Sequence, residues 1–324
     1  MKSSNKMFIL TEAVLAVMVI ITVFGMLWGK NGERQRRVSV IVKGSDDTRW
    51  AAFKYGLRMA AQDEGIALFI ASMGEDLTAE EEIEAIEREI DNGADAVIVQ
   101  PVSGGDTQKM LKKIEKRVPV ILVEDTAAGG KKGVDISAVK PDDCAVGQTL
   151  AEELLKDYSG NIRGKTLGFV SKYGDSEAVQ ERKKGIVSVL EDTGVKAAWE
   201  VANFSRDEGD IVLEQKSKVD FVVALDDYSL VLAGKAAASN NLHGALVYGI
   251  GNSMEAVYCL DSDYAQCLIV PDDFDMGYQS MLEASKSFGH LIRRTESRTI
   301  NYTIMRKKDL FTKENQKVLF TMGQ

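Results

Sequence analysis

From residue 38 onwards the chain alternates short apolar runs with segments of helical periodicity, and this alternation restricts its fold more than any other sequence feature. The apolar runs are continuous, so they predict parallel strands that are buried on both faces. We expect these strands at 38–42, 67–71, 96–99, 118–123, 166–170, 197–201, 221–224, 246–250 and 265–270. The segments between them, such as 78–92 with its apolar stripe, predict helices. Alternating units of this length indicate an α/β fold with doubly wound parallel sheets.

The alternation occurs in two successive sets, which predicts two lobes that face each other across one cleft. A glycine-rich turn at 129–133 precedes the second set, and Pro141 suits the first turn of its first helix.

The charge of the chain excludes one large class of partners. Residues 1–37 hold six of the 40 basic and two of the 49 acidic residues, so the remainder carries a formal charge of −13. Proteins that bind nucleic acid present basic surfaces, so we expect no nucleic-acid partner. The three cysteines, Cys144, Cys259 and Cys267, are odd in number and lack metal-ligand spacing. They predict neither a disulfide framework nor a metal site.

Sequence signs of catalysis are weak. The two histidines, His243 and His290, lie near no serine or cysteine elbow. The segment Gly249-Ile250-Gly251-Asn252 lacks the third glycine of a dinucleotide-binding turn. We therefore expect a binding protein rather than an enzyme, with no cofactor.

The N-terminal segment 7–28 is long and apolar, with Lys2 and Lys6 before it and a basic stretch after it. As a helix it would reach roughly 33 Å, enough to cross a hydrocarbon core of about 30 Å. No small-residue cleavage site or lipid-accepting cysteine follows. We predict an uncleaved transmembrane anchor at 7–28 and a juxtamembrane linker at 29–37; a signal peptide with a poor cleavage site is the alternative. The flanking charges alone lean towards a cytoplasmic main domain.

Candidate binding residues follow the predicted strands, because ligands of open α/β sheets bind beyond the carboxyl ends of the strands. The candidates in the first lobe are Asp47, Arg49, Trp50, Gln100, Glu124 and Asp125. The candidates in the second lobe are Gln180, Arg182, Phe204 and Asp226. Asp125 and Asp226 are charged at strand ends, where a carboxylate is costly to bury without a partner.

Several of these positions form a pattern. Gln100-Pro101 follows the third strand, Arg182-Lys183-Lys184-Gly185 has an Arg-x-x-Gly spacing, and 273–277 reads Asp-Phe-Asp-Met-Gly. Because these motifs follow one another in this order, the chain from residue 38 onwards resembles the type 1 periplasmic sugar-binding proteins of the ribose-binding class. These proteins share a core with lac-repressor-like regulators. The resemblance implies two doubly wound lobes that close on a ligand. The expected N-terminal lobe comprises residues 38–141 and 272–298, and the expected C-terminal lobe comprises 142–271 and 299–324. Three chain crossings, near 140–142, 271–273 and 297–300, would join the lobes. A repressor function is not expected, because the apolar segment stands where a helix-turn-helix would be.

The resemblance also implies roles for the candidate residues. Trp50 and Phe204 would cover the apolar faces of a sugar ring, while carboxylates and amides would bind its hydroxyl groups. The chain departs from the class at Gln180, where an arginine is common, and at Asp226, where an asparagine is common. The cleft would therefore be acidic, which leads to the hypothesis of an amine-bearing ligand or a bound cation. Alternatively, some of these carboxylates point to solvent.

A sugar-receptor-like cleft is useful outside the cell, so the resemblance implies an extracytoplasmic domain in spite of the flanking charges. The expected function is a membrane-tethered solute-binding protein for a sugar or sugar-like solute, acting with an ABC permease. The alternative is a sensory module that acts with a membrane histidine kinase and has an altered or absent sugar site.

Overall fold

The computed structural model describes residues 15–20, 22, 34–45, 48–74, 77–103, 106–126, 136–205, 208–288 and 295–323. The chain divides into two compact units, Met1–Arg36 and Arg37–Gln324. In the first unit residues 15–20 and 22 are helical, and the rest of the predicted anchor lies outside the described residues. No helix among the described residues is long and apolar enough to span a bilayer.

The second unit contains two six-stranded sheets, which confirms the predicted pair of α/β lobes. The first sheet has the order β11-β5-β4-β3-β1-β2, with all neighbours parallel. Its strands are β1 (Arg37–Ile41), β2 (Ala67–Ile70), β3 (Ala96–Val99), β4 (Val120–Val123), β5 (Ala138–Pro141) and β11 (Arg298–Ile300). Its helices are α2 (Ala51–Asp63), α3 (Ala79–Asp91), α4 (Thr107–Glu115) and α10 (Asp273–Lys286), with a short 3-10 helix η1 (Thr48–Trp50).

The second sheet has the order β12-β10-β9-β8-β6-β7, in which β12 alone runs antiparallel to its neighbour. Its strands are β6 (Thr166–Ser171), β7 (Lys196–Ala202), β8 (Phe221–Ala224), β9 (Leu246–Ile250), β10 (Cys267–Pro271) and β12 (Tyr302–Met305). Its helices are α5 (Asp143–Asp157), α6 (Glu177–Leu190), α7 (Gly209–Glu214), α8 (Asp227–Ala238), α9 (Met254–Asp261) and α11 (Lys313–Met322), with 3-10 helices η2 (Glu191–Thr193) and η3 (Lys307–Asp309).

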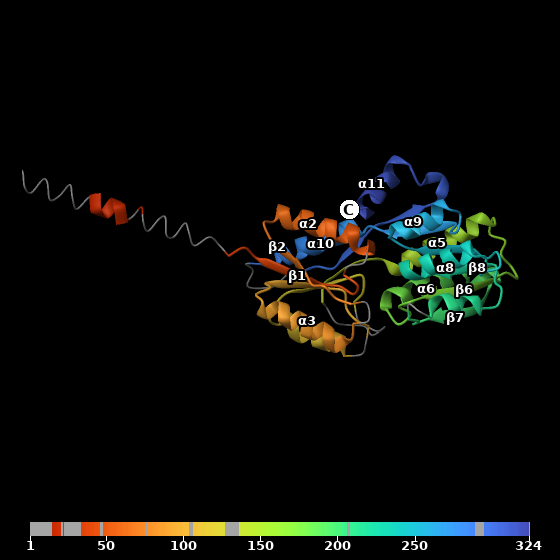
Figure 1. Ribbon diagram of the computed structural model, residues 1–324, viewed down its shortest axis with the longest axis horizontal. Helices are drawn as coiled ribbons and strands as arrows, with labels where there is room; N and C mark the ends of the chain where they lie inside the picture. The colour runs from red at the N-terminus through yellow and green to blue at the C-terminus, as the bar shows by residue number, and fades with distance from the viewer. Residues whose placement is uncertain are drawn as a thin grey trace, which may run out of the picture. The chain divides into compact units, whose positions relative to one another are not determined.

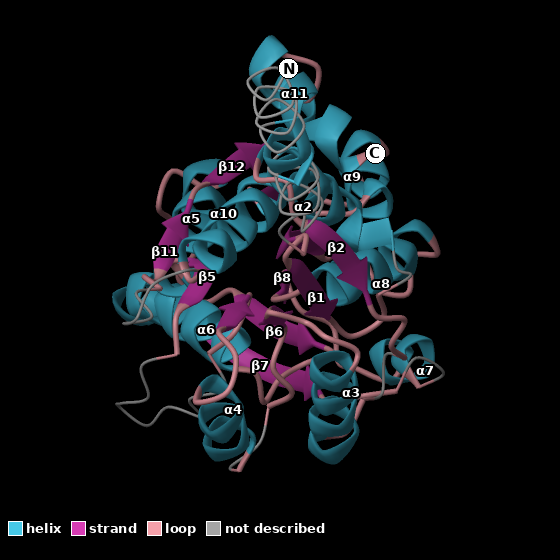
Figure 2. Cartoon of the chain, turned by 90° about the vertical axis from the view of Figure 1, so that its left-hand side faces the viewer, coloured by secondary structure: helices cyan, strands magenta, loops and turns pink. Residues whose placement is uncertain are grey.

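Helices cover both faces of each sheet, as continuous apolar strands require. In the first lobe α2 and α10 lie on one side and α3 and α4 on the other (Figure 2). Alternate strand residues divide between the two layers: Val40 packs with Phe53 and Met276, whereas Ile41 packs with Ile86. The second lobe has the same two apolar layers around its sheet.

Helix α3 shows how local sequence sets a boundary. It starts at a capping box in which the Thr78 hydroxyl accepts from the Glu81 amide and the Glu81 carboxylate accepts from the Thr78 amide. Such a reciprocal cap satisfies two amide groups that a helix start would leave open. The predicted helix 78–92 therefore agrees with the observed one to within a residue at each end.

Within the described residues the chain passes between the two sheets after β5, after β10 and between β11 and β12. Pro141 was expected in the first turn of a helix, but it is the last residue of β5. Helix α5 starts two residues later because the Asp142 side chain accepts from the Ala145 amide and caps it. Strands β5, β11 and β12 were not predicted, since they have three or four residues and lack a long apolar run.

Helix α10 comes late in the chain yet lies beside α2 in the first lobe (Figure 1). The two helices touch at Gly56 and Gly277, where an added Cβ atom would lie 2.0 Å from the Phe274 carbonyl oxygen and 2.1 Å from the Phe53 carbonyl oxygen. In the second lobe α5 and α6 make an equivalent contact through Gly147 and Gly185. Glycine therefore sets the close approach of both helix pairs, and α10 fixes the second crossing to the first lobe.

Candidate functional site

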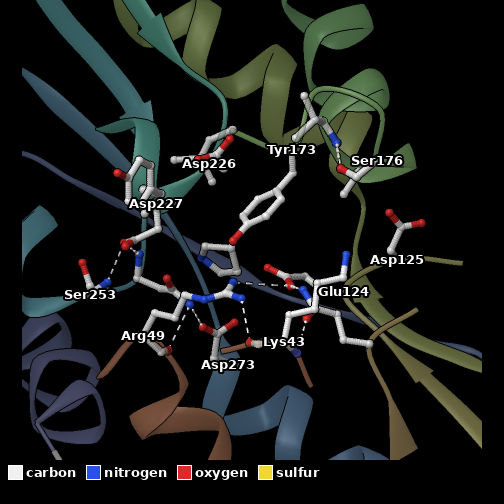
Figure 3. A pocket seen from close by; sticks show the side chains of 18 of the residues that line it. Lys43, Arg49, Glu124, Asp125, Tyr173, Ser176, Asp226, Asp227, Ser253 and Asp273 are labelled. Carbon is white, nitrogen blue, oxygen red and sulfur yellow. Dashed lines mark hydrogen bonds and ion pairs between the residues drawn. The ribbon is translucent and has the colours of Figure 1, made fainter. Parts of the chain in front are cut away.

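A cavity of about 460 Å³ lies between the carboxyl ends of the strands of both lobes. The first lobe contributes the segments after β1, β3 and β4, and the second lobe those after β6, β8 and β9. Two crossing residues, Pro141 and Pro271, also line it. The site thus occupies the position at which open α/β sheets bind ligands. Figure 3 shows side chains from both lobes pointing into this space.

The structure brings six of the predicted site residues to the cavity. These are Arg49, Gln100, Glu124, Asp125, Arg182 and Asp226. Trp50, Gln180 and Phe204 are not among the lining residues, and Asp47 lies outside the described residues.

The two aromatic candidates belong to the cores of their lobes. Trp50 is 1% exposed, packs on Phe53, and its indole nitrogen donates to the Lys43 carbonyl oxygen at 2.9 Å. Phe204 is buried in the core of the second lobe. Gln180 donates through its amide group to the Gly174 carbonyl oxygen and holds the β6–α6 loop. These three side chains support the walls of the cavity rather than line it.

A cluster of three polar side chains lies on the first-lobe side of the cavity: Arg49, Gln100 and Glu124. The Gln100 amide nitrogen donates to Glu124 Oε2 at 2.6 Å, and Gln100 Oε1 accepts from the Lys43 amide at 3.0 Å. The Arg49 guanidinium lies 3.8 Å from Glu124 Oε2 and over the Trp50 ring, 4.4 Å from its centroid. Trp50 therefore positions Arg49, which presents a cation to the cavity.

Lys43 supplies a second cation to this side of the cavity. Burial lowers the pKa of its ammonium group, although the carboxylates of Glu82 and Asp125 oppose this. No carboxylate among the described residues lies within ion-pair distance of the Lys43 nitrogen. The ammonium group is thus placed to donate to a polar ligand.

Most carboxylates of the second-lobe side are held by backbone amides. Asp226 caps α8: its oxygens accept from the Ser229 amide at 2.9 Å and the Lys172 amide at 2.8 Å. Asp227 Oδ1 accepts from the amides of Asn252 and Ser253, both at 2.8 Å. These bonds fix the loops that line the cavity. Burial raises the pKa of the Asp227 carboxyl group, and the hydrogen bonds from Asn252 and Ser253 oppose this shift.

Asp125 joins the lobes on one side of the cleft. Its Oδ2 accepts from the Glu177 amide at the start of α6, at 3.0 Å. The neighbouring Thr126 hydroxyl bonds the Glu177 carboxylate, which also lies 3.6 Å from the Lys140 nitrogen. Asn252 bridges the other side, where its amide group donates to the Arg49 carbonyl oxygen at 3.4 Å and to Asp273.

Asp273, the first residue of α10, is 5% exposed and lines the cavity. Burial raises the pKa of its carboxyl group to about 8; the Asn252 hydrogen bond opposes the shift and the Glu124 charge adds to it. Near neutral pH this group is therefore largely protonated in the ligand-free protein.

Several residues that line the cavity were not among the predicted site residues. They include Lys43, Tyr173, Asp227, Tyr228, Asn252 and Asp273. Four of them lie within three residues after an expected strand end, so the strand-end rule applied without family templates would have found Lys43, Asp227, Asn252 and Asp273. Tyr173 follows β6, which extends to Ser171, one residue beyond the predicted strand. Its ring lies 5.7 Å from the Lys43 nitrogen and 6.0 Å from the Arg49 guanidinium carbon.

Beneath the first-lobe side, Glu82 of α3 is fully buried. Its Oε1 accepts from the Val102 amide at 2.9 Å, which holds the loop carrying Pro101 and Ser103 to the cavity. No described group bonds Oε2. Burial raises the pKa of Glu82 from 4.5 to about 7. Between about pH 4.5 and pH 7, Glu82 therefore keeps a proton in the folded protein that it has lost in the unfolded chain.

We expect Glu82→Gln to stabilise the protein at pH 8 by about 2–3 kcal/mol and to change stability at pH 5 by less than about 1 kcal/mol. A raised carboxyl pKa gives stability that is present below about pH 4.5 and is lost as the pH rises through about 7. Glutamine keeps the acceptor for Val102 and removes the ionisation. Denaturant unfolding at both pH values measures the effect; equal changes at the two pH values would contradict it.

Comparison with known proteins identifies the family. A family model described as the periplasmic binding protein domain matches residues 38–286. The chain therefore belongs to the periplasmic binding protein domain family, of the type 1 class that the sequence pattern indicated. Membership in a family of binding proteins agrees with the expectation that the chain is not an enzyme. No curated protein sequence matches the chain significantly.

Solved structures share the fold at low identity. A carbohydrate transporter solute-binding protein from Agrobacterium radiobacter, in complex with D-arabinose, is 17% identical with a TM-score of 0.76, over 89% of this chain and 99% of that one. A galactofuranose binding protein is 19% identical with a TM-score of 0.76, over 89% and 100%. XylFII in the XylFII-LytSN complex is 14% identical with a TM-score of 0.73, over 85% and 99%. At such identities the likeness concerns the fold.

Proposed function

We propose that the chain is an extracytoplasmic solute-binding protein whose two lobes close on a small polar ligand of the sugar class. The observation that carries this proposal is the interlobe cavity of about 460 Å³, which suits a small ligand and is lined by charged, amide and tyrosine side chains. Groups such as Lys43, Gln100 and Glu124 can donate to and accept from a polyhydroxyl ligand. Complexes of similar folds with D-arabinose and with tagatopyranose support this ligand class.

Membrane tethering is part of the proposal. It rests on the apolar segment 7–28 and on the absence of a nearby cleavage signal. A domain of this family acts on solutes outside the cytoplasm, so we place residues 38–324 on that side of the membrane. Protease added to intact cells should digest this domain, and full protection would contradict the placement.

Two roles fit a tethered binding protein. In the first, the closed lobes deliver the ligand to an ABC permease. In the second, the lobes act on a membrane histidine kinase, and a similar fold that was solved in the XylFII-LytSN complex supports a role of this kind. Affinity capture of the full chain from solubilised membranes separates the two: recovery of permease subunits supports transport, and recovery of a kinase supports sensing.

Ligand binding should stabilise the folded protein. We expect a rise in the unfolding temperature with at least one member of a panel of pentoses, hexoses, polyols and amino sugars, because a ligand at a hundredfold its Kd contributes about 2.7 kcal/mol. Thermal unfolding of the full chain in detergent micelles measures the shift. Absence of a shift with every compound would favour the sensory module with an altered or absent sugar site.

A further inference from the structure

The two crossings that follow β5 and β10 have the same sequence pattern. Residues 141–147 and 271–277 both read Pro-Asp-Asp-x-x-x-Gly. In each copy the proline ends a strand, the first aspartate caps a helix, and the glycine makes the close helix contact. The second aspartate, Asp143 or Asp273, is the first residue of that helix and is buried in both copies. The copies can therefore be compared position by position.

The buried aspartate of the first copy is neutralised by cations of the chain itself. Asp143 accepts from the Arg182 guanidinium at 2.8 Å and from the Lys140 ammonium at 3.2 Å. The Arg182 guanidinium also donates to the Leu225 carbonyl oxygen at 2.9 Å. A buried carboxylate is stable when it is paired and hydrogen-bonded in this way.

The buried aspartate of the second copy has an amide where the first copy has cations. Asp273 accepts from the Asn252 side chain, and no cation among the described residues lies within ion-pair distance of it. Arg49 acts on Asp273 from further away and also lies 3.8 Å from Glu124. Figure 3 shows Asp273 and Glu124 beside the Arg49 side chain, so one guanidinium faces two carboxyl groups. In the ligand-free protein a proton on Asp273 therefore takes the place that the Arg182 and Lys140 cations have at Asp143.

Carboxyl groups outnumber cationic side chains in the described lining of the cavity. The carboxyl groups are Glu124, Asp125, Asp226, Asp227, Glu255 and Asp273, and the cationic side chains are Lys43, Arg49, Arg182 and Lys235. Lys235 and Glu255 are exposed, and Arg182 is bound to Asp143. Lys172, which is buried and is not among the lining residues, has its ammonium nitrogen 4.5 Å from the Tyr228 ring centroid. The interior of the cavity thus offers a cationic guest several carboxyl groups, of which Asp273 is paired with no cation among the described residues.

We propose that the ligand supplies a positive charge as a protonated amine carried on a polyhydroxyl body, and that this amine binds at the Asp273 carboxylate, which releases its proton to solvent when the ligand binds. The proposal rests on the sugar-class function proposed above and specifies its ligand. An ammonium group has three donors, which match the carboxyl oxygens of Asp273 and Glu124 and leave one for a neighbouring acceptor. The hydroxyl groups of the ligand would meet Lys43 and Gln100.

Matched sugar pairs test this inference. The full chain in detergent micelles is titrated calorimetrically with D-glucosamine and D-glucose, and with D-galactosamine and D-galactose. We expect the amino sugar of at least one pair to bind about tenfold more tightly than its neutral partner, and Asp273→Asn to reduce this preference to less than about threefold. Asp272→Asn is the matched control: it removes a charge one residue away, outside the lining, and asparagine can still cap α10. It should keep the tenfold preference.

The outcomes separate this inference from the function on which it rests. Neutral sugars that bind as tightly as their amino partners, or more tightly, would overturn the amine site and leave the sugar-class function standing. A preference that persists in a folded Asp273→Asn variant would also overturn it, and circular dichroism establishes the folding. Failure of every sugar and amino sugar to bind the wild-type chain would overturn both proposals.

Discussion

Replacing Arg182 with leucine should lower the free energy of unfolding by about 3–5 kcal/mol, the largest effect expected of a single substitution here. The Asp143 and Arg182 side chains are 1% and 6% exposed and bond each other at 2.8 Å. Removing the guanidinium leaves a buried carboxylate with Lys140 as its remaining cation, and it leaves the Leu225 carbonyl oxygen without this donor. Urea unfolding at pH 7 measures the loss.

A double variant distinguishes lost pairing from lost packing. In Arg182→Leu with Asp143→Asn, the carboxylate charge disappears together with the guanidinium. We expect the double variant to be more stable than Arg182→Leu alone, because the uncompensated charge accounts for most of the cost. A single variant that loses less than about 1 kcal/mol, or a double variant that is less stable than the single one, would show that the pair is not a buried ion pair in solution.

Gly277→Ala should destabilise the protein by about 2–3 kcal/mol. The added Cβ atom would lie 2.1 Å from the Phe53 carbonyl oxygen, so α2 and α10 must separate and the second crossing must shift with them. Alanine is otherwise the better helix residue, and any loss therefore reports on the helix contact. Because α10 carries Asp273 at its start, the same substitution should also weaken ligand binding.

Gly74→Ala is the control for this prediction. Apart from its chain neighbours, no atom of the described residues lies within 4 Å of the position that its Cβ would take. We expect its stability to stay within about 0.5 kcal/mol of the wild type, as is usual for surface substitutions. If both glycine variants unfolded at the same urea concentration as the wild type, the close packing of α2 against α10 would be refuted.

The sequence pattern was sufficient for the lobes and insufficient for the short connecting strands. Continuous apolar runs such as 96–99 and 221–224 can be stable only between two helix layers, and they became β3 and β8. Strand β11 has three residues and forms because Arg298–Ile300 pairs with β5, which is distant in the sequence. No local sequence pattern predicts such a pairing. Pro141 was assigned to a helix because proline favours a first turn. Its neighbour Asp142 is the stronger signal and moves the helix start.

The site was predictable where the strand-end rule alone decides it. Glu124 follows β4 directly, Asp226 comes two residues after β8, and both line the cavity. Trp50 and Phe204 depended on the direction of an aromatic side chain, which the packing of each core decides. The charge balance of the cavity could not be predicted from the sequence either, because it depends on which carboxyl groups lie beside cations in the fold. Asp143 is paired with Arg182, whereas Asp273 is bonded to the Asn252 amide group.

Binding calorimetry of the full chain in detergent micelles tests whether the cavity between the lobes binds a sugar-class solute. Each sugar and amino sugar that raises the unfolding temperature is titrated into the wild type and into Lys43→Met. We expect saturable binding of one ligand per chain, weakened about tenfold or more in Lys43→Met, because a charge-assisted hydrogen bond in the cavity is lost. Binding that is unchanged in Lys43→Met, or no binding of any sugar or amino sugar to the wild type, would contradict it.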